Sequence, residues 1–167
     1  MFLEKIYLGI GGNIGNREDN LELAKLLIEE RVGSIFRTSS LYETAAWGVE
    51  EQPDFLNQVL EVTTRLSASE VLTTILDIEK QMGRTRTQKW YARSIDIDLL
   101  FYGDKIIEEE NLIVPHPFIG DRNFVLIPLN ELQPNFLHPK HQKTIAELLA
   151  NCPDTLGVRQ VGHGSLI

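Results

Sequence analysis

The sequence contains a single cysteine, Cys152, among 167 residues. One cysteine excludes an intramolecular disulfide and a thiolate zinc cage, because both need at least two thiols. No apolar run approaches the roughly 18–20 residues that a membrane-spanning helix needs. The first five residues already carry charges, which does not fit a secretory signal peptide. We therefore expect a soluble, cytoplasmic protein with no membrane partner.

Positive charge is also scarce, since 16 Lys and Arg residues face 24 Asp and Glu residues and leave a net charge of −8. This balance argues against a protein that coats nucleic acid or an anionic membrane. Hydrophobic residues make up 43% of the chain, which excludes intrinsic disorder. No internal repeat is visible, and the length predicts one domain over residues 1–167. Nothing in the sequence demands more than a monomer.

Hydrophobic periodicity and capping residues predict alternating strands and helices. Asn16 is placed to cap the first helix, and Ser67 or Ser69 begins the second. We expect strands over residues 5–10, 34–44, 56–64 and 94–102, helices over 16–31, 67–82, 121–132 and 144–150, and a short hairpin return over 105–107. The leading order, β-α-β-β-α-β, predicts an α+β fold of the ferredoxin-like type, with helices packed on a mostly antiparallel sheet.

Glycines are dense in residues 9–15, a pattern that resembles a phosphate-binding loop. The dinucleotide pattern needs glycine where this chain has Ile14, and the Walker pattern needs a Gly-Lys-Ser/Thr run that is missing. The segment is therefore interpreted as a tight strand-to-helix turn. Close approach of its backbone to a ligand is the lesser alternative.

The sharpest motif is the pair Asp96 and Asp98 in a segment that alternates like a strand. Side chains two residues apart on a strand share one face, about 7 Å apart. Two carboxylates at that distance repel by about 2 kcal/mol at an effective dielectric constant near 20, and a divalent cation would reverse the sign. The alternative is a solvated, charged strand face. The opposite face is expected to hold Ile95, Ile97, Leu99 and Phe101.

A basic segment directly precedes this pair. It comprises Arg84, Arg86, Lys89, Trp90, Tyr91 and Arg93. Metal-binding carboxylates beside several cationic side chains suit a polyphosphate substrate. We favour a lid that closes on substrate, with a solvated loop as the alternative.

Histidines are few and give weaker signals. His116, Arg122 and Phe124 lie within nine positions of one another. His138 and His141 are spaced like a helical metal pair, but nearby prolines argue against a helix there. We assign no role to these two residues, or to His163 in an expected mobile tail.

Taken together, the motifs resemble the 6-hydroxymethyl-7,8-dihydropterin pyrophosphokinase family. The resemblance runs from the glycine-rich segment to Leu129 and is weak after Leu132, so residues 133–167 form a weakly matched extension. It is carried by residues 9–15, 39–44, 52–57, 79–84, 93–100, 114–116 and 122–124.

The resemblance implies transfer of diphosphate from ATP to the hydroxymethyl group of the pterin, with release of AMP. It implies that Asp96 and Asp98 bind two Mg²⁺ ions, and Asp98 is the one candidate for a general base. Roles near ATP are implied for six further residues. The catalytic lid would contain Arg84, Trp90 and Arg93, the triphosphate would contact His116 and Arg122, and Glu79 would lie near the nucleotide.

The resemblance also implies a pterin site. The ring would lie between Phe55 and Phe124, while Asn57 and the backbone around Thr44 to Trp47 would bind its polar edge. This chain has Tyr91-Ala92 where the family usually has Gly-Pro. Three alternatives remain: another two-metal phosphotransferase, such as a nucleotidyltransferase palm; a non-catalytic ligand-binding or RNA-binding module; and, if the lid changes are disabling, a regulatory nucleotide sensor that has lost catalysis. The first does not explain the aromatic pair with Asn57, and the second does not fit the net charge of −8.

Overall fold

The computed structural model describes residues 2–45, 53–83 and 95–164 of the chain. Its centre is an antiparallel sheet of six strands in the order β5-β1-β4-β3-β8, with β2 also paired to β4. The strands are β1 Glu4–Gly12, β2 Gly33–Thr38, β3 Leu41–Thr44, β4 Phe55–Thr64, β5 Asp96–Tyr102 and β8 Val158–Gly162. The expected α+β class is confirmed, whereas the finer ferredoxin-like assignment stays a prediction.

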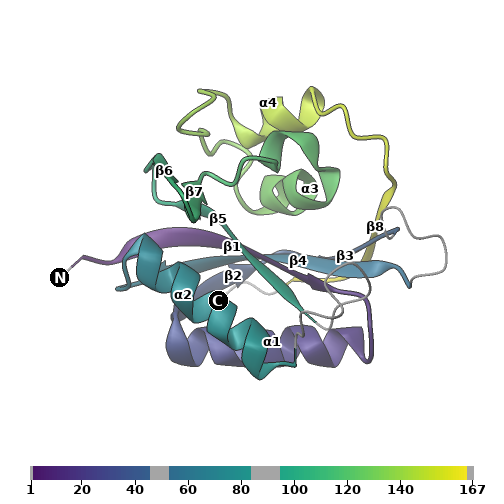
Figure 1. Cartoon of the computed structure of the whole chain (residues 1–167). Coiled ribbons are helices and arrows are strands. Elements are labelled where there is room, and N and C mark those ends of the chain that lie inside the picture. Colours follow the sequence, from purple (N-terminus) through teal and green to yellow (C-terminus); the bar gives the residue numbers. More distant parts are fainter. Residues whose placement is uncertain (1, 46–52, 84–94, 165–167) are drawn as a thin grey trace.

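Helices cover both faces of this sheet (Figure 1). Helices α1 (Arg17–Arg31) and α2 (Ala68–Gln81) lie on one face, and α3 (Asn123–Leu132) and α4 (Ile145–Ala150) lie on the other. The short hairpin of β6 (Ile107–Glu109) and β7 (Leu112–Val114) lies on the same side as α3. No helix in the described ranges is long and apolar enough to cross a membrane.

Capping residues fix where the first two helices begin. Asn16 accepts a hydrogen bond from the N–H of Asp19, and Ser67 forms a reciprocal capping box with Glu70. Both caps satisfy backbone donors that have no partner within the helix. The expected starts at Asn16 and Ser67 are confirmed.

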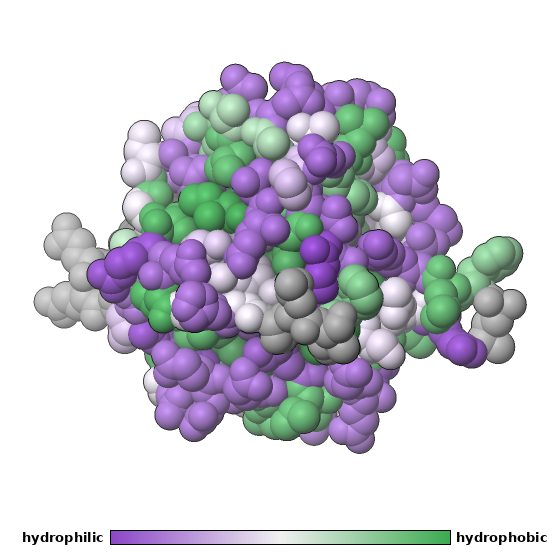
Figure 2. All heavy atoms as spheres, turned by 180° about the vertical axis from the view of Figure 1, so that it is seen from behind, coloured by the Kyte–Doolittle hydropathy of each residue, from purple (hydrophilic) through white to green (hydrophobic). Residues whose placement is uncertain are grey.

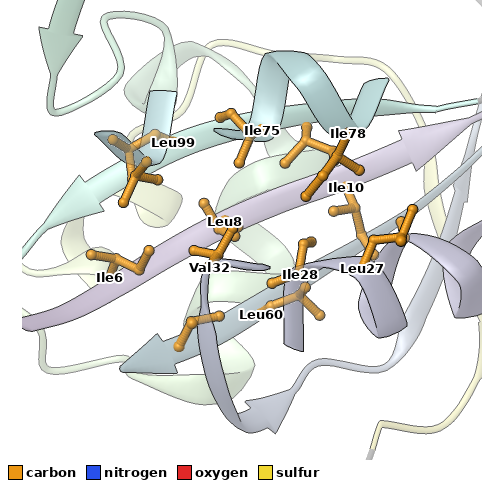
Figure 3. Close-up of a cluster of buried hydrophobic side chains, with 14 of the residues drawn as sticks. Ile6, Leu8, Ile10, Leu27, Ile28, Val32, Leu60, Ile75, Ile78 and Leu99 are labelled. Atoms are coloured by element: carbon orange, nitrogen blue, oxygen red, sulfur yellow. The ribbon is translucent and has the colours of Figure 1, made fainter. Parts of the chain in front are cut away.

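The larger core lies between the sheet and α1 and α2. Figure 3 shows side chains of β1, α1, α2, β4 and β5 meeting there, including Ile6, Leu8, Ile28, Ile75 and Leu99. Each of these five is less than 9% exposed. Burial of such side chains supplies about 1.5–3 kcal/mol each and holds the sheet against its helices.

A second core lies on the opposite face, under α3 and α4. Tyr7 and Phe101 pack there edge to face, with ring centroids 6.1 Å apart, and Phe136 contacts both. The expectation that Phe101 shares a face with Leu99 is wrong. The pairing of β1 with β5 shifts between Tyr7 and Leu8, so Leu100 is an extra residue and Phe101 turns to the other face.

The strand expected over residues 34–44 is two strands, because the chain breaks at Ser39 and Ser40. The N–H and hydroxyl of Ser40 both donate to the carboxylate of Glu131, at 2.9 and 2.7 Å. The Ser39 hydroxyl accepts from the N–H of Val59 at 2.9 Å. Serine side chains here replace part of the strand ladder with local and tertiary hydrogen bonds.

Three further expectations need correction. The segment 105–107 does not return along β5, because Ile107 begins a hairpin with β7 instead. The glycine-rich segment is not a turn throughout, because β1 continues to Gly12. The expected strands omit β8, which pairs with β3 directly before His163, while mobility at His163 stays a prediction.

The face turned away from the viewer of Figure 1 is drawn in Figure 2. Hydrophobic atoms occur there in separate groups between polar ones. Scattered apolar surface of this kind is normal for a folded protein.

Candidate active site

A cavity of about 160 Å³ lies on the face of the sheet that α3 covers. Strands β1, β4 and β5 form its floor, with Thr44 of β3 at one side and the start of α3 above. An engineered apolar cavity of about 150 Å³ holds a benzene molecule, so this volume suits a small aromatic ring system. The cavity is partly open to solvent.

Strand register places three chemically different residues in one row across the cavity floor. Asp96 of β5 pairs with Gly11 of β1, and Gly11 pairs with Asn57 of β4. Residues directly opposite in a sheet share a face. Two strand spacings separate Asp96 from Asn57, or about 10 Å between their Cα atoms. The space above Gly11 therefore lies between a carboxylate and an amide.

Gly11 leaves this space open because it has no side chain, and a Cβ added there would collide with its neighbours. A Cβ on Gly11 would lie 2.6 Å from Oδ1 of Asn57 and 3.2 Å from the backbone oxygen of Leu56. By contrast, a Cβ on Gly9 would meet only Leu100 carbons, at 3.6 Å or more. The backbone of Gly9 and Gly11 lines the cavity, which supports the alternative interpretation of the glycine-rich segment.

The Asn57 side chain is fixed in place before any ligand arrives. It is 9% exposed, and its amide nitrogen donates to the hydroxyl of Thr44 at 2.9 Å. That bond directs the amide oxygen toward Gly11, close to where a Cβ on that residue would stand. Thr44 and Asn57, both expected near the pterin, are brought together.

Asp96 and Asp98 both border the main cavity, as their spacing predicts. Asp98 is the more exposed of the two, and it also borders a second cavity of about 310 Å³. Glu79 and His116 line that second cavity. Asp98 thus stands where the two cavities meet.

Glu79 has a structural contact that sequence reasoning did not anticipate. Its carboxylate is buried, and Oε2 accepts the N–H of Ile97 at 2.7 Å. Ile97 lies between the two aspartates on β5, which is an edge strand of the sheet. A helix carboxylate that satisfies an edge N–H fixes the strand and shields it from other pairing. Glu79 therefore helps to position Asp96 and Asp98.

His116 is held by backbone contacts on both sides. Its backbone N–H donates to the carbonyl of Leu100 at 3.0 Å, and its ring Nδ1 accepts a hydrogen bond from the backbone N–H of Phe118 at 3.2 Å. Burial lowers the pKa of His116, an effect that the Asp98 charge opposes and the Arg122 charge reinforces. Because Nδ1 accepts a hydrogen bond, the neutral ring carries its proton on Nε2 as a donor.

Arg122 and Phe124 flank the start of α3. The Arg122 guanidinium carbon lies 4.8 Å from the ring centre of Phe118 and 5.5 Å from that of Phe124. These cation–π contacts hold the guanidinium beside the main cavity. Phe55 and Phe124, both half-buried, line that cavity from β4 and from α3.

Three expected site residues, Arg84, Trp90 and Arg93, lie outside the described residues, and their roles stay predictions. Sequence reasoning also missed Leu156, which lines the main cavity from the C-terminal segment. A lone leucine between Thr155 and Gly157 gives no periodic signal. The glycine-rich pattern drew attention to Gly9 and Gly11, but chiefly as members of a turn.

Fold and site together define the class: an α+β protein with a small-molecule cavity on its sheet face, bordered by paired carboxylates and half-buried aromatic rings. The profile of a family described as 7,8-dihydro-6-hydroxymethylpterin-pyrophosphokinase (HPPK) matches residues 7–134. The chain therefore belongs to this family.

Curated relatives agree with this membership. The chain is 43% identical over 142 residues to a 2-amino-4-hydroxy-6-hydroxymethyldihydropteridine pyrophosphokinase of Aquifex aeolicus, covering 85% of this chain and 88% of that protein. It is 42% identical over 127 residues to the Bacillus subtilis protein of the same name, covering 75% and 76% of the two.

Solved structures show the same fold. A wild-type HPPK-DHPS chain of Plasmodium falciparum, crystallised with pteroate, superposes with a TM-score of 0.73 at 19% identity. The match covers 89% of this chain and 42% of that one, so this chain spans less than half of the larger protein.

Proposed function

We propose that the two cavities are the two substrate sites of a pyrophosphokinase, with the pterin above Gly11 and the nucleotide beside His116. The chain is an ATP-dependent pyrophosphokinase of folate biosynthesis, which transfers diphosphate to 6-hydroxymethyl-7,8-dihydropterin. The observation that carries the placement is Asp98, because it borders both cavities. A group that passes from one substrate to the other has to cross this point.

The main cavity suits a flat, polar heterocycle. Phe55 and Phe124 offer ring faces from two different elements, and aromatic rings stack favourably on such a heterocycle. Asn57 offers an amide whose orientation Thr44 already fixes. A site with a preset hydrogen-bonding group rejects ligands that lack the matching group, so Asn57 supplies specificity and the rings supply affinity.

The acidic pair suits Mg²⁺, of which we propose two ions. Asp96 and Asp98 provide hard oxygen ligands on one face of β5, and Mg²⁺ is usually held by one or two carboxylates together with substrate phosphates and water. When bound, the ions would offset the negative charge of the phosphate oxygens. The buried Glu79 keeps both carboxylates aimed at the cavity by holding Ile97 between them.

A cationic group beside the main cavity and a donor group beside the second cavity complete the phosphate environment. Arg122 presents a guanidinium held by two aromatic rings. His116 lines the second cavity, and because its Nδ1 accepts from Phe118, the neutral ring has Nε2–H as a donor. We propose that both contact the triphosphate, and that Arg84, Arg93 and Trp90 act from the lid, with Arg93 stabilising charge at the leaving AMP.

The test is the identity of the nucleotide product. The purified chain is incubated with ATP, Mg²⁺ and 6-hydroxymethyl-7,8-dihydropterin, and the nucleotides are separated, with a parallel reaction that lacks the pterin. Pterin-dependent formation of AMP is expected. Pterin-dependent ADP would mean that a single phosphoryl group is transferred, and no pterin-dependent product would overturn the assignment of the two cavities.

Broader expectations stay predictions. A single domain over residues 1–167 is supported by the two cores, which share the same sheet. A cytoplasmic monomer without a nucleic-acid partner is tested by sedimentation of the purified chain and by its location in fractionated cells.

A further inference from the structure

The C-terminal segment contributes Leu156 to the lining of the main cavity and lies outside the residues that match the family. Figure 1 shows the yellow chain running from the layer of α3 and α4 down to β8 at the sheet. Residues 154–158 make this crossing, and each end of the crossing is fixed to a different wall of the cavity. Leu156, midway between the ends, lines the cavity.

The upper end is fixed by Asp154. Its Oδ2 accepts a hydrogen bond from the backbone N–H of Asn123 at 3.0 Å, and its backbone carbonyl accepts one from the side-chain amide of Asn123 at 2.9 Å. Helix α3 begins at Asn123, and Arg122 at its N-cap makes no side-chain capping bond. Asp154 therefore supplies the cap from 31 positions along the chain, where a carboxylate also complements the helix dipole.

The lower end is fixed by β8. Val158 pairs with Thr44 of β3, and Arg159 forms an ion pair with Glu43, which also lies on β3. Arg17 bonds the other oxygen of Glu43 at 2.8 Å, and both arginines lower the pKa of that carboxyl. The segment is thus tied to the strand that orients Asn57 through Thr44.

Asp154 also holds the backbone of Leu156. Its second oxygen, Oδ1, accepts the N–H of Leu156 at 2.9 Å. One carboxylate therefore holds both the start of α3, next to Arg122 and Phe124, and the leucine that lines the same cavity as those two residues.

We propose that residues 154–158 form the closing wall of the pterin site, with Leu156 as a ring contact that determines pterin affinity and Asp154 as the positioning residue for Phe124. This proposal rests on the assignment of the main cavity to the pterin. It places part of the specificity in a segment beyond the family match.

Leu156→Ala tests the contact, with Thr155→Ala as the matched control, since Thr155 is the exposed neighbour on the same segment. Shortening an apolar side chain in a binding pocket weakens binding by about tenfold. We expect the KM and dissociation constant for the pterin to rise by that factor in Leu156→Ala, with kcat and the KM for ATP within about twofold of wild type. Equal pterin affinity in the two variants would overturn the proposal.

Asp154→Ala and Asp154→Asn test the positioning role. Asparagine keeps one acceptor oxygen but replaces the other with an NH₂ donor, so it can accept from Asn123 or from Leu156 but not from both, and it should recover only part of the pterin affinity that alanine loses. A purely structural role predicts a lower melting temperature with unchanged affinity in the folded protein, and that result would overturn the positioning role. If wild type itself gives no pterin-dependent AMP, the proposed function fails. If wild type turns over and the variants bind the pterin as tightly as wild type does, this inference alone fails.

Discussion

Gly11 offers the sharpest test of the cavity floor, because a single methyl group should disturb it. In Gly11→Ala the new carbon would lie 2.6 Å from Oδ1 of Asn57, about 0.4 Å inside the 3.0 Å that real Cβ atoms keep. Asn57 cannot retreat without loss, because it is 9% exposed and bonded to Thr44. The methyl group would also occupy the space proposed for the pterin ring.

Overpacking of this kind costs about 1–3 kcal/mol. We expect the free energy of unfolding to fall by that amount in urea denaturation. The same strain, with the displaced amide, should weaken pterin binding by at least about tenfold, a loss of about 1.4 kcal/mol. Calorimetric titration with the pterin measures this loss, and titration with ATP should change little.

Gly9→Ala is the matched control, since Gly9 lies on the same strand and lines the same cavity. Its new carbon would make ordinary contacts with Leu100, so the free energy of unfolding should stay within about 0.5 kcal/mol of wild type. A double variant, Gly11→Ala with Asn57→Ala, removes the clashing oxygen and should recover part of the lost stability. If Gly11→Ala unfolds and binds the pterin like wild type, the reasoning about the cavity floor is refuted.

Three further predictions concern the carboxylates and a buried histidine. Asp96→Asn and Asp98→Asn should each lower kcat by at least about a hundredfold at saturating Mg²⁺ with an unchanged melting temperature, because they remove a charged metal ligand but keep the shape; near-normal turnover in both would exclude the metal assignment. Glu79→Ala should lower the free energy of unfolding by about 1–3 kcal/mol, since it leaves the N–H of Ile97 without this acceptor, and an unchanged urea midpoint would show that the contact is dispensable. Burial lowers the pKa of His138 from 6.5 to about 4, so the neutral ring's contribution to the free energy of unfolding is complete above pH 6.5 and is lost as pH falls toward 4. This loss of up to about 3 kcal/mol should be absent in His138→Gln. Parallel curves of unfolding free energy for the two proteins from pH 7 to 4 would contradict it.

Local chemistry made much of the fold predictable. Asn16 and Ser67 predict helix starts because their side chains accept hydrogen bonds from backbone N–H groups three residues further on. The positions of Asp96 and Asp98 follow from the two-residue period of a strand, which does not depend on tertiary structure. Thr44 and Asn57 were expected together through the family resemblance, and register places them on neighbouring strands.

Features that depend on distant partners were not predictable from local patterns. Phe101 changes face because β5 carries one residue more than β1 at the bulge, and only the pairing shows this. The break at Ser40 depends on Glu131, 91 positions away. Leu156 depends on Asp154, whose partner Asn123 lies 31 positions away, and α3 has no side-chain cap of its own at Arg122.

The site works as a unit because both ends of one strand row are constrained. Asp96, Gly11 and Asn57 lie in register, so the distance between the carboxylate and the amide is set by strand spacing rather than by flexible loops. Each end of the row has its own clamp: Glu79 holds the acidic end through Ile97, and Thr44 holds the amide end. Loosening either clamp should therefore change the distance between the two substrates, and slow diphosphate transfer more than it weakens the binding of either substrate alone.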